Sequence, residues 1–144
     1  MSHVKHVRSM QRRWQTKMII EIILNVGKFI LDLATSGIQA NKAKKAQIAD
    51  DLIQISELLE KVATSLEQDV CAFKECAAVN IATESLIEKI RESVDPELIK
   101  LLEENMMDCT LPEKLTACQN RKESAKRLKT ASGRFLAAGL LAKY

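Results

Sequence analysis

The most distinctive pattern in the chain lies between Lys17 and Gly37, where polar residues recur at helical spacing. They occupy positions 17, 21, 25, 28, 32 and 36, in steps of three or four residues. On a helix with about 3.6 residues per turn, this spacing gathers them into one narrow stripe and leaves the remaining surface apolar. Such a helix needs either other helices packed around it or a membrane to lie in. A core helix is the simpler expectation.

The same helical face extends toward the N-terminus. Five residues spaced three or four apart carry it: Val4, Val7, Met10, Trp14 and Met18. We therefore expect one helix from about residue 4 to residue 35, with Gly37 as its C-terminal stop.

A second apolar pattern begins at Ile48 and has heptad spacing. Its first members are Ile48, Leu52, Ile55, Leu59, Val62 and Leu66, and it continues to Val94. Heptad spacing is typical of the seam of a bundle or coiled coil. One helix of that length would overshoot a compact domain of this size, so we expect a break. The capping-box pattern Thr64-Ser65-Leu66-Glu67 is the preferred position, and Ser85-Leu86-Ile87-Glu88 is the second.

Two further helix starts are marked by proline. Asp95-Pro96-Glu97 combines an N-cap with proline at the first helical position, which predicts a short helix from 96 to about 107. Thr110-Leu111-Pro112-Glu113 repeats this logic and predicts a last helix from about 112 to 142.

These elements predict an all-α fold, an antiparallel up-and-down bundle of four long helices plus one short helix. With 4 Gly, 2 Pro and 3% aromatic residues, the composition argues against a sheet. We expect residues 1–144 to form a single domain, in which the basic segment 1–17 is continuous with the first helix. The expected core comprises Ile22, Ile23, Val26, Phe29, Ile30, Leu52, Ile55, Leu59, Leu66, Phe73, Leu86, Ile90, Leu115, Leu128 and Phe135.

The net charge of +3 conceals a strong segregation along the chain. Residues 1–20 carry five basic residues and no acid, whereas residues 50–108 hold 15 acids against 5 bases. Residues 109–144 are basic again, with 8 bases against 2 acids. The simpler interpretation is that basic end helices lie beside an acidic middle; the sharper one is an anionic partner for the basic ends.

The N-terminal segment is the candidate for binding such a partner. Its candidate residues are Lys5, Arg8, Arg12, Arg13, Trp14 and Lys17. A basic amphipathic helix with a tryptophan suits an anionic membrane surface. A constitutive span is not expected, because Glu21, Lys28 and Asp32 interrupt the apolar stretch that follows.

Four cysteines stand at positions 71, 76, 109 and 118. Their spacing fits no common zinc pattern, and no histidine lies nearby in the sequence. A hairpin turning at Asp95-Pro96 would bring Cys76 near Cys109 and Cys71 near Cys118, so two nested disulfides are one alternative. Four free thiols in a reducing compartment are the preferred alternative, because no secretory signal is recognisable.

Catalytic patterns are weak in this sequence. The only imidazoles are His3 and His6 at the N-terminus, and neither a glycine-rich phosphate loop nor a Glu-x-x-His pair occurs. We therefore expect no enzymatic activity and no cofactor. Nucleic-acid binding is not expected either, because the basic ends contain few aromatic residues and no helix-turn-helix spacing.

The sequence thus favours a non-enzymatic interaction or oligomerisation module that binds a protein partner or itself. The alternative is a bundle that associates with membranes, or permeabilises them, through the basic segment and the apolar helix 18–34. The expected location is cytoplasmic, with peripheral attachment to a membrane under the alternative.

Overall fold

The structure, a computed structural model, describes the backbone of residues 2–108, 110–117 and 120–143, and the side chains of these ranges from residue 19 onward. All regular secondary structure in these ranges is helical, which confirms the predicted all-α bundle. The helices are α1 (Ser2–Ser36), α2 (Lys42–Glu67), α3 (Phe73–Ile90), α4 (Pro96–Asn105), α5 (Leu111–Thr116) and α6 (Arg121–Lys143).

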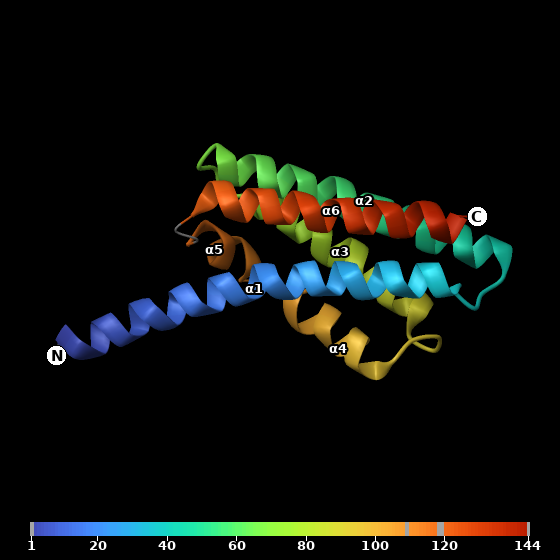
Figure 1. The fold of residues 1–144 in the computed structure, drawn as a ribbon, viewed down its shortest axis with the longest axis horizontal. Helices are drawn as coiled ribbons and strands as arrows, with labels where there is room; N and C mark the ends of the chain where they lie inside the picture. Colours follow the sequence, from blue (N-terminus) through green and yellow to red (C-terminus); the bar gives the residue numbers. More distant parts are fainter. Residues whose placement is uncertain (1, 109, 118–119, 144) are drawn as a thin grey trace.

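Helices α1, α2 and α3 alternate in direction, and the short helices α4 and α5 carry the chain back before α6 (Figure 1). As a result α1, α3 and α6 run the same way and α2 runs against them. Helix α6 lies between α1 and α2, and the two terminal helices are therefore parallel neighbours. The N-terminus lies beyond one end of the bundle and the C-terminus at the other (Figure 1).

Helix α6 approaches both neighbours closely at small residues. A Cβ built on Gly139 would lie 2.8 Å from Cγ1 of Ile53 and 3.2 Å from the carbonyl oxygen of Ala49, both on α2. On the other side, a Cβ on Gly27 of α1 would lie 3.3 Å from Cβ of Arg134. Glycine at these contacts lets the helix backbones come close together.

The break between α2 and α3 falls at residues 68–72, just past the preferred position, and it forms by a different mechanism. Asp69 adopts a positive φ of 57°, and the Val70 N–H donates to the carbonyl of Ser65 at 2.9 Å. This is a Schellman-type helix stop. Thr64 is not an N-cap, because its hydroxyl donates back to the Glu60 carbonyl within α2. Ser85, in the second predicted capping box, lies within α3.

The start of α4 is confirmed: Asp95 is the N-cap and its Oδ1 accepts the Glu97 N–H at 3.0 Å. The single last helix predicted from 112 to 142 is wrong, because the chain forms α5 and then α6. The Thr110 side chain makes no cap bond. Instead, Asn120 precedes α6 and its Oδ1 accepts the Glu123 N–H at 3.3 Å.

The buried side chains form one connected core, and twelve of the predicted core residues lie in it. These are Ile23, Val26, Ile30, Leu52, Ile55, Leu59, Leu66, Leu86, Ile90, Leu115, Leu128 and Phe135. Ile22 is half-buried and packs against the core. Two predictions are wrong: Phe29 is 51% exposed and Phe73 is 59% exposed.

The polar stripe of α1 explains the exposure of Phe29. Asn25, Lys28 and Asp32 are exposed as the spacing predicts, and Phe29 projects beside them rather than toward the core. Glu21 is half-buried and forms an ion pair with Arg127 of α6. The buried line of α1 thus runs through Ile23, Val26 and Ile30, and Phe29 lies to one side of it, next to the polar stripe.

Candidate functional site

The predicted anion-binding residues Lys5, Arg8, Arg12, Arg13, Trp14 and Lys17 all belong to the N-terminal half of α1. Their side chains lie outside the described part of the structure, so this site stays a prediction. Within the described residues, no helix is both long enough and apolar enough to cross a bilayer.

Helix α3 has two different apolar faces. The inner face is buried and includes Cys76, Val79 and Leu86. The outer face carries Phe73 at 59% and Ile81 at 69% exposure, with the exposed Ala77 between them and Val70 (53% exposed) in the turn before the helix. Residues four apart are neighbours on a helix surface, so Phe73, Ala77 and Ile81 form one line, which we call the α3 stripe.

Charged residues border the stripe unevenly. Lys74 is exposed beside its N-terminal half, whereas Glu84 and Glu88 are exposed and continue the same line toward the C-terminal end of α3. The outer face of this helix is therefore apolar and basic at one end and acidic at the other.

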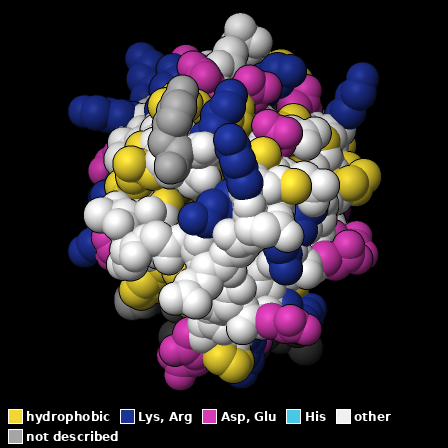
Figure 2. Space-filling view, turned by 90° about the vertical axis from the view of Figure 1, so that its right-hand side faces the viewer, with side chains coloured by type: hydrophobic (Ala, Val, Ile, Leu, Met, Phe, Trp, Pro, Cys, Tyr) yellow, Lys and Arg dark blue, Asp and Glu magenta, His cyan; other side chains and the backbone are white. Residues whose placement is uncertain are grey.

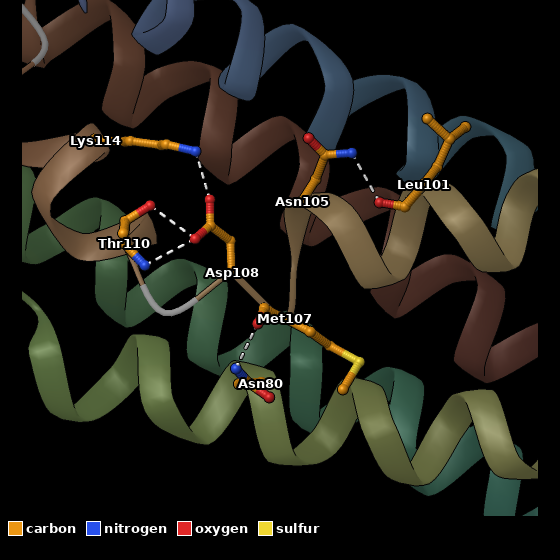
Figure 3. A network of polar contacts seen from close by, with 7 residues as sticks. All are labelled: Asn80, Leu101, Asn105, Met107, Asp108, Thr110 and Lys114. Atoms are coloured by element: carbon orange, nitrogen blue, oxygen red, sulfur yellow. Dashed lines mark hydrogen bonds and ion pairs between the residues drawn. The ribbon is translucent and has the colours of Figure 1, made fainter.

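Polar contacts on both flanks fix the orientation of α3. On the α2 side, Lys89 donates to the Asp51 carboxylate at 2.6 Å, and the Ser85 hydroxyl donates to the same carboxylate at 3.2 Å. On the other side, Asn80 donates to the carbonyl of Met107 at 2.8 Å (Figure 3). These contacts hold the inner face against the core and keep the α3 stripe pointing outward.

The connection between α4 and α5 is held by a compact polar network (Figure 3). The Asp108 carboxylate accepts from the Thr110 N–H at 2.9 Å and the Thr110 hydroxyl at 2.7 Å, and it pairs with Lys114. Burial raises the pKa of Asp108, but the hydrogen bonds from Lys114 and Thr110 outweigh it and lower the pKa below its usual 3.8. This network orders the connection beside α3, and its members act on one another rather than on an open site.

Two of the four cysteines, Cys71 and Cys76, are described, and no disulfide joins them to each other. Cys76 is buried, and this burial together with the nearby Cys71 and Glu75 raises its pKa to about 12. Cys71 is half-buried, and its sulfur accepts from the Thr116 hydroxyl at 3.2 Å. Cys109 and Cys118 lie outside the described residues, so the two predicted disulfide pairings stay predictions.

No group of three or more metal-ligating side chains occurs within the described ranges. Two open surface hollows, of about 550 and 370 Å³, lie over the first turns of α6 and beside α4, and charged side chains of both signs line each. Basic and acidic side chains also intermingle at the end of the molecule shown in Figure 2. Both signs of charge are mixed on these surfaces, whereas on the outer face of α3 the basic and acidic residues lie at opposite ends.

The apolar pattern that continues from Leu66 to Val94 passes through Phe73 and Ile81 before it reaches Ile87, and one step in it indicates a change of helix face. From Phe73 the line advances in steps of four to Ile81, and then jumps six residues to Ile87. Six residues on a helix rotate the position by about 240°, onto another face. The sequence also contains a second apolar line at helical spacing, through Cys76, Val79 and Leu86, and this line is the one that faces the core.

Comparisons with protein-family models, with curated proteins and with solved structures found no match for this chain.

Proposed function

We propose that this protein is a non-enzymatic interaction module that binds an apolar helix face through the α3 stripe. The observation that carries the proposal is the exposure of Ile81 and Phe73 in one line on a long helix. Isolated exposed apolar residues are common on soluble proteins, but a contiguous apolar line rimmed by charges is typical of an interaction surface.

The binding energy would come mainly from removing these side chains from water. Each square ångström of apolar surface buried contributes about 25 cal/mol, before the costs of association are subtracted. Those costs are reduced here, because Asp51, Lys89 and Asn80 already hold α3 in place. A preordered helix loses little conformational entropy on binding.

The shape of the stripe favours a helical partner. Its apolar positions repeat every four residues, so a partner helix with apolar residues at i and i+4 would lie along it. Acidic and basic residues beside the partner's apolar line would meet Lys74 at one end and Glu84 at the other.

A site-specific crosslinking experiment tests the proposal. A photoreactive phenylalanine analogue is placed at Ile81 in one variant and at Lys126, on the exposed side of α6, in the control. Irradiation in concentrated purified protein and in lysate should yield protein adducts at position 81 and few at 126. Equal yields at both positions, or none at 81, would reject the α3 stripe as a binding surface.

Association with an anionic membrane through the basic segment is the alternative proposal. Ile19, Ile23 and Ile30 are at most 4% exposed, so permeabilisation by α1 would require the bundle to open. Peripheral binding requires no opening and should weaken with added salt. Co-sedimentation with anionic vesicles should fall when Arg12 and Arg13 are replaced by glutamine, and neutral vesicles serve as the control. Absence of binding to anionic vesicles would remove this alternative.

A further inference from the structure

We infer that the partner of the α3 stripe is a second copy of this chain, and that two α3 helices pack antiparallel across a two-fold axis. This inference rests on the proposed function, namely that the stripe binds an apolar helix, and it identifies that helix as α3 of the second copy. The distribution of charge and the distribution of side-chain size along the outer face of α3 both favour this arrangement.

Charge selects the antiparallel direction. Lys74 lies at the N-terminal end of the stripe, and Glu84 and Glu88 lie toward the C-terminal end. In a parallel pair, equivalent residues would face one another, and two sets of glutamates would be brought together. In an antiparallel pair that crosses near Ala77, Glu84 of one copy lies within about one helical turn of Lys74 of the other, so opposite charges approach each other twice. The opposed helix dipoles favour the same direction.

Side-chain size supports the same arrangement. Ala77 is the middle residue of the line from Phe73 to Ile81, and its small side chain lets two helices approach at the crossing point. A two-fold axis at Ala77 places Phe73 of one copy against Ile81 of the other. The apolar line of a single copy is thus self-complementary, as a two-fold interface requires.

The size of the contact predicts a weak dimer. Helix α3 has 18 residues, which at about 1.5 Å per residue gives a contact no longer than about 27 Å. A two-helix contact of this size belongs to the small class of interfaces, so we expect a dissociation constant on the order of micromolar.

Sedimentation equilibrium on the purified full chain is the first test. The wild type should shift from monomer to dimer with increasing concentration, and Ile81→Lys should raise the dissociation constant by at least about tenfold. Leu140→Lys is the matched control, because Leu140 is 48% exposed on α6, away from the stripe. It should leave the dissociation constant unchanged. Because both positions are exposed, both variants should keep the helical circular dichroism of the wild type.

A charge exchange tests the direction of packing. Lys74→Glu and Glu84→Lys should each weaken the dimer several-fold, and the double variant should return to within about twofold of wild type. A double variant weaker than either single variant would overturn the antiparallel arrangement.

The experiments distinguish failure of the dimer from failure of the α3 stripe as a binding surface. A chain that remains monomeric at high concentration, while position 81 still crosslinks to another protein, overturns the dimer and leaves the interaction module standing. A dimer unaffected by Ile81→Lys also overturns the inference, because another surface would then form it. Absence of both dimer and crosslinks at position 81 rejects the inference and the proposed function together.

Discussion

Helices α6 and α3 both carry apolar residues at helical spacing, yet their surroundings differ. Helix α6 lies between α1 and α2, and Phe135, at 0% exposure, is fully enclosed. Helix α3 packs its inner face on the core and leaves Phe73 and Ile81 on the outside. Apolar spacing therefore identifies the faces that can be buried, while the number of neighbouring helices decides which of them are buried within the chain.

The two helices also differ in the size of the side chains on the faces compared. Along α6, small residues such as Gly139 and Ser132 meet α2 at close range, and the Ser132 hydroxyl donates to the Ser56 carbonyl at 2.7 Å. The α3 stripe has large apolar side chains around one small central residue. The small residues of α6 contact α2 within one chain, whereas Phe73 and Ile81 of the stripe remain largely exposed.

Truncation of the two phenylalanines should change stability by very different amounts. Phe135→Ala should lower the free energy of unfolding by about 3–5 kcal/mol, because it leaves a cavity in a closed core. Phe73→Ala should lower it by less than about 1 kcal/mol, because that side chain is already largely hydrated. Urea denaturation at concentrations below the dimer range measures both. Similar losses in the two variants would show that Phe73 is buried within the monomer.

Two glycines of α6 differ in how closely they approach α2. Gly139→Ala should lower the free energy of unfolding by about 1 kcal/mol, because the contact with Ala49 and Ile53 costs more than the gain in helix propensity. Gly133→Ala should raise it by about 0.5–1 kcal/mol, since its Cβ would meet nothing within 4 Å. The same denaturation curves measure both, and a stabilising Gly139→Ala would contradict the close packing of α6 on α2.

The inner face of α3 can be tested through its thiol. Cys76 is 4% exposed and its pKa is raised to about 12, so iodoacetamide should modify Cys71 well before Cys76 in the native protein. Peptide mass mapping follows the two sites separately. Because the folded protein holds the Cys76 thiol in its neutral form, the thiol stabilises the folded state fully below pH 9. This stabilisation is lost as the pH rises from 9 toward 12. Equal modification rates would indicate that α3 detaches from the core.

The smallest effect concerns the network that holds the α4–α5 connection beside α3. The lowered pKa of Asp108 contributes stability that is present above pH 3.8 and is lost as the pH falls through the lower folded-state value. Asp108→Asn should therefore reduce stability at neutral pH and flatten its decline between pH 4 and 2. Acid unfolding followed by circular dichroism measures this. Asp50→Asn, at an exposed position of α2, is the control and should leave the curve unchanged.

Much of the helical architecture could be predicted, because helix periodicity and proline are local signals. The polar stripe of α1 and the Asp95-Pro96 start were read correctly. The stop after α2 was mislocated, because it depends on Asp69 adopting a positive φ, which no glycine announces. The division of the last helix has a similar cause: α6 begins at an Asn-x-x-Glu cap in which Asn120 accepts the Glu123 N–H, and no proline marks this start.

The sequence separates two apolar lines on α3 at the six-residue step from Ile81 to Ile87, but both lines have the spacing of a core face, so the sequence does not say which line is buried. Local sequence by itself determined that these residues form a helix and that each line lies on one side of it. The tertiary structure alone decided which line faces inward, since α2 and the Met107 carbonyl anchor α3 through Asp51 and Asn80. Burial depends on contacts between segments far apart in the chain, and the spacing of residues within one helix carries no record of them.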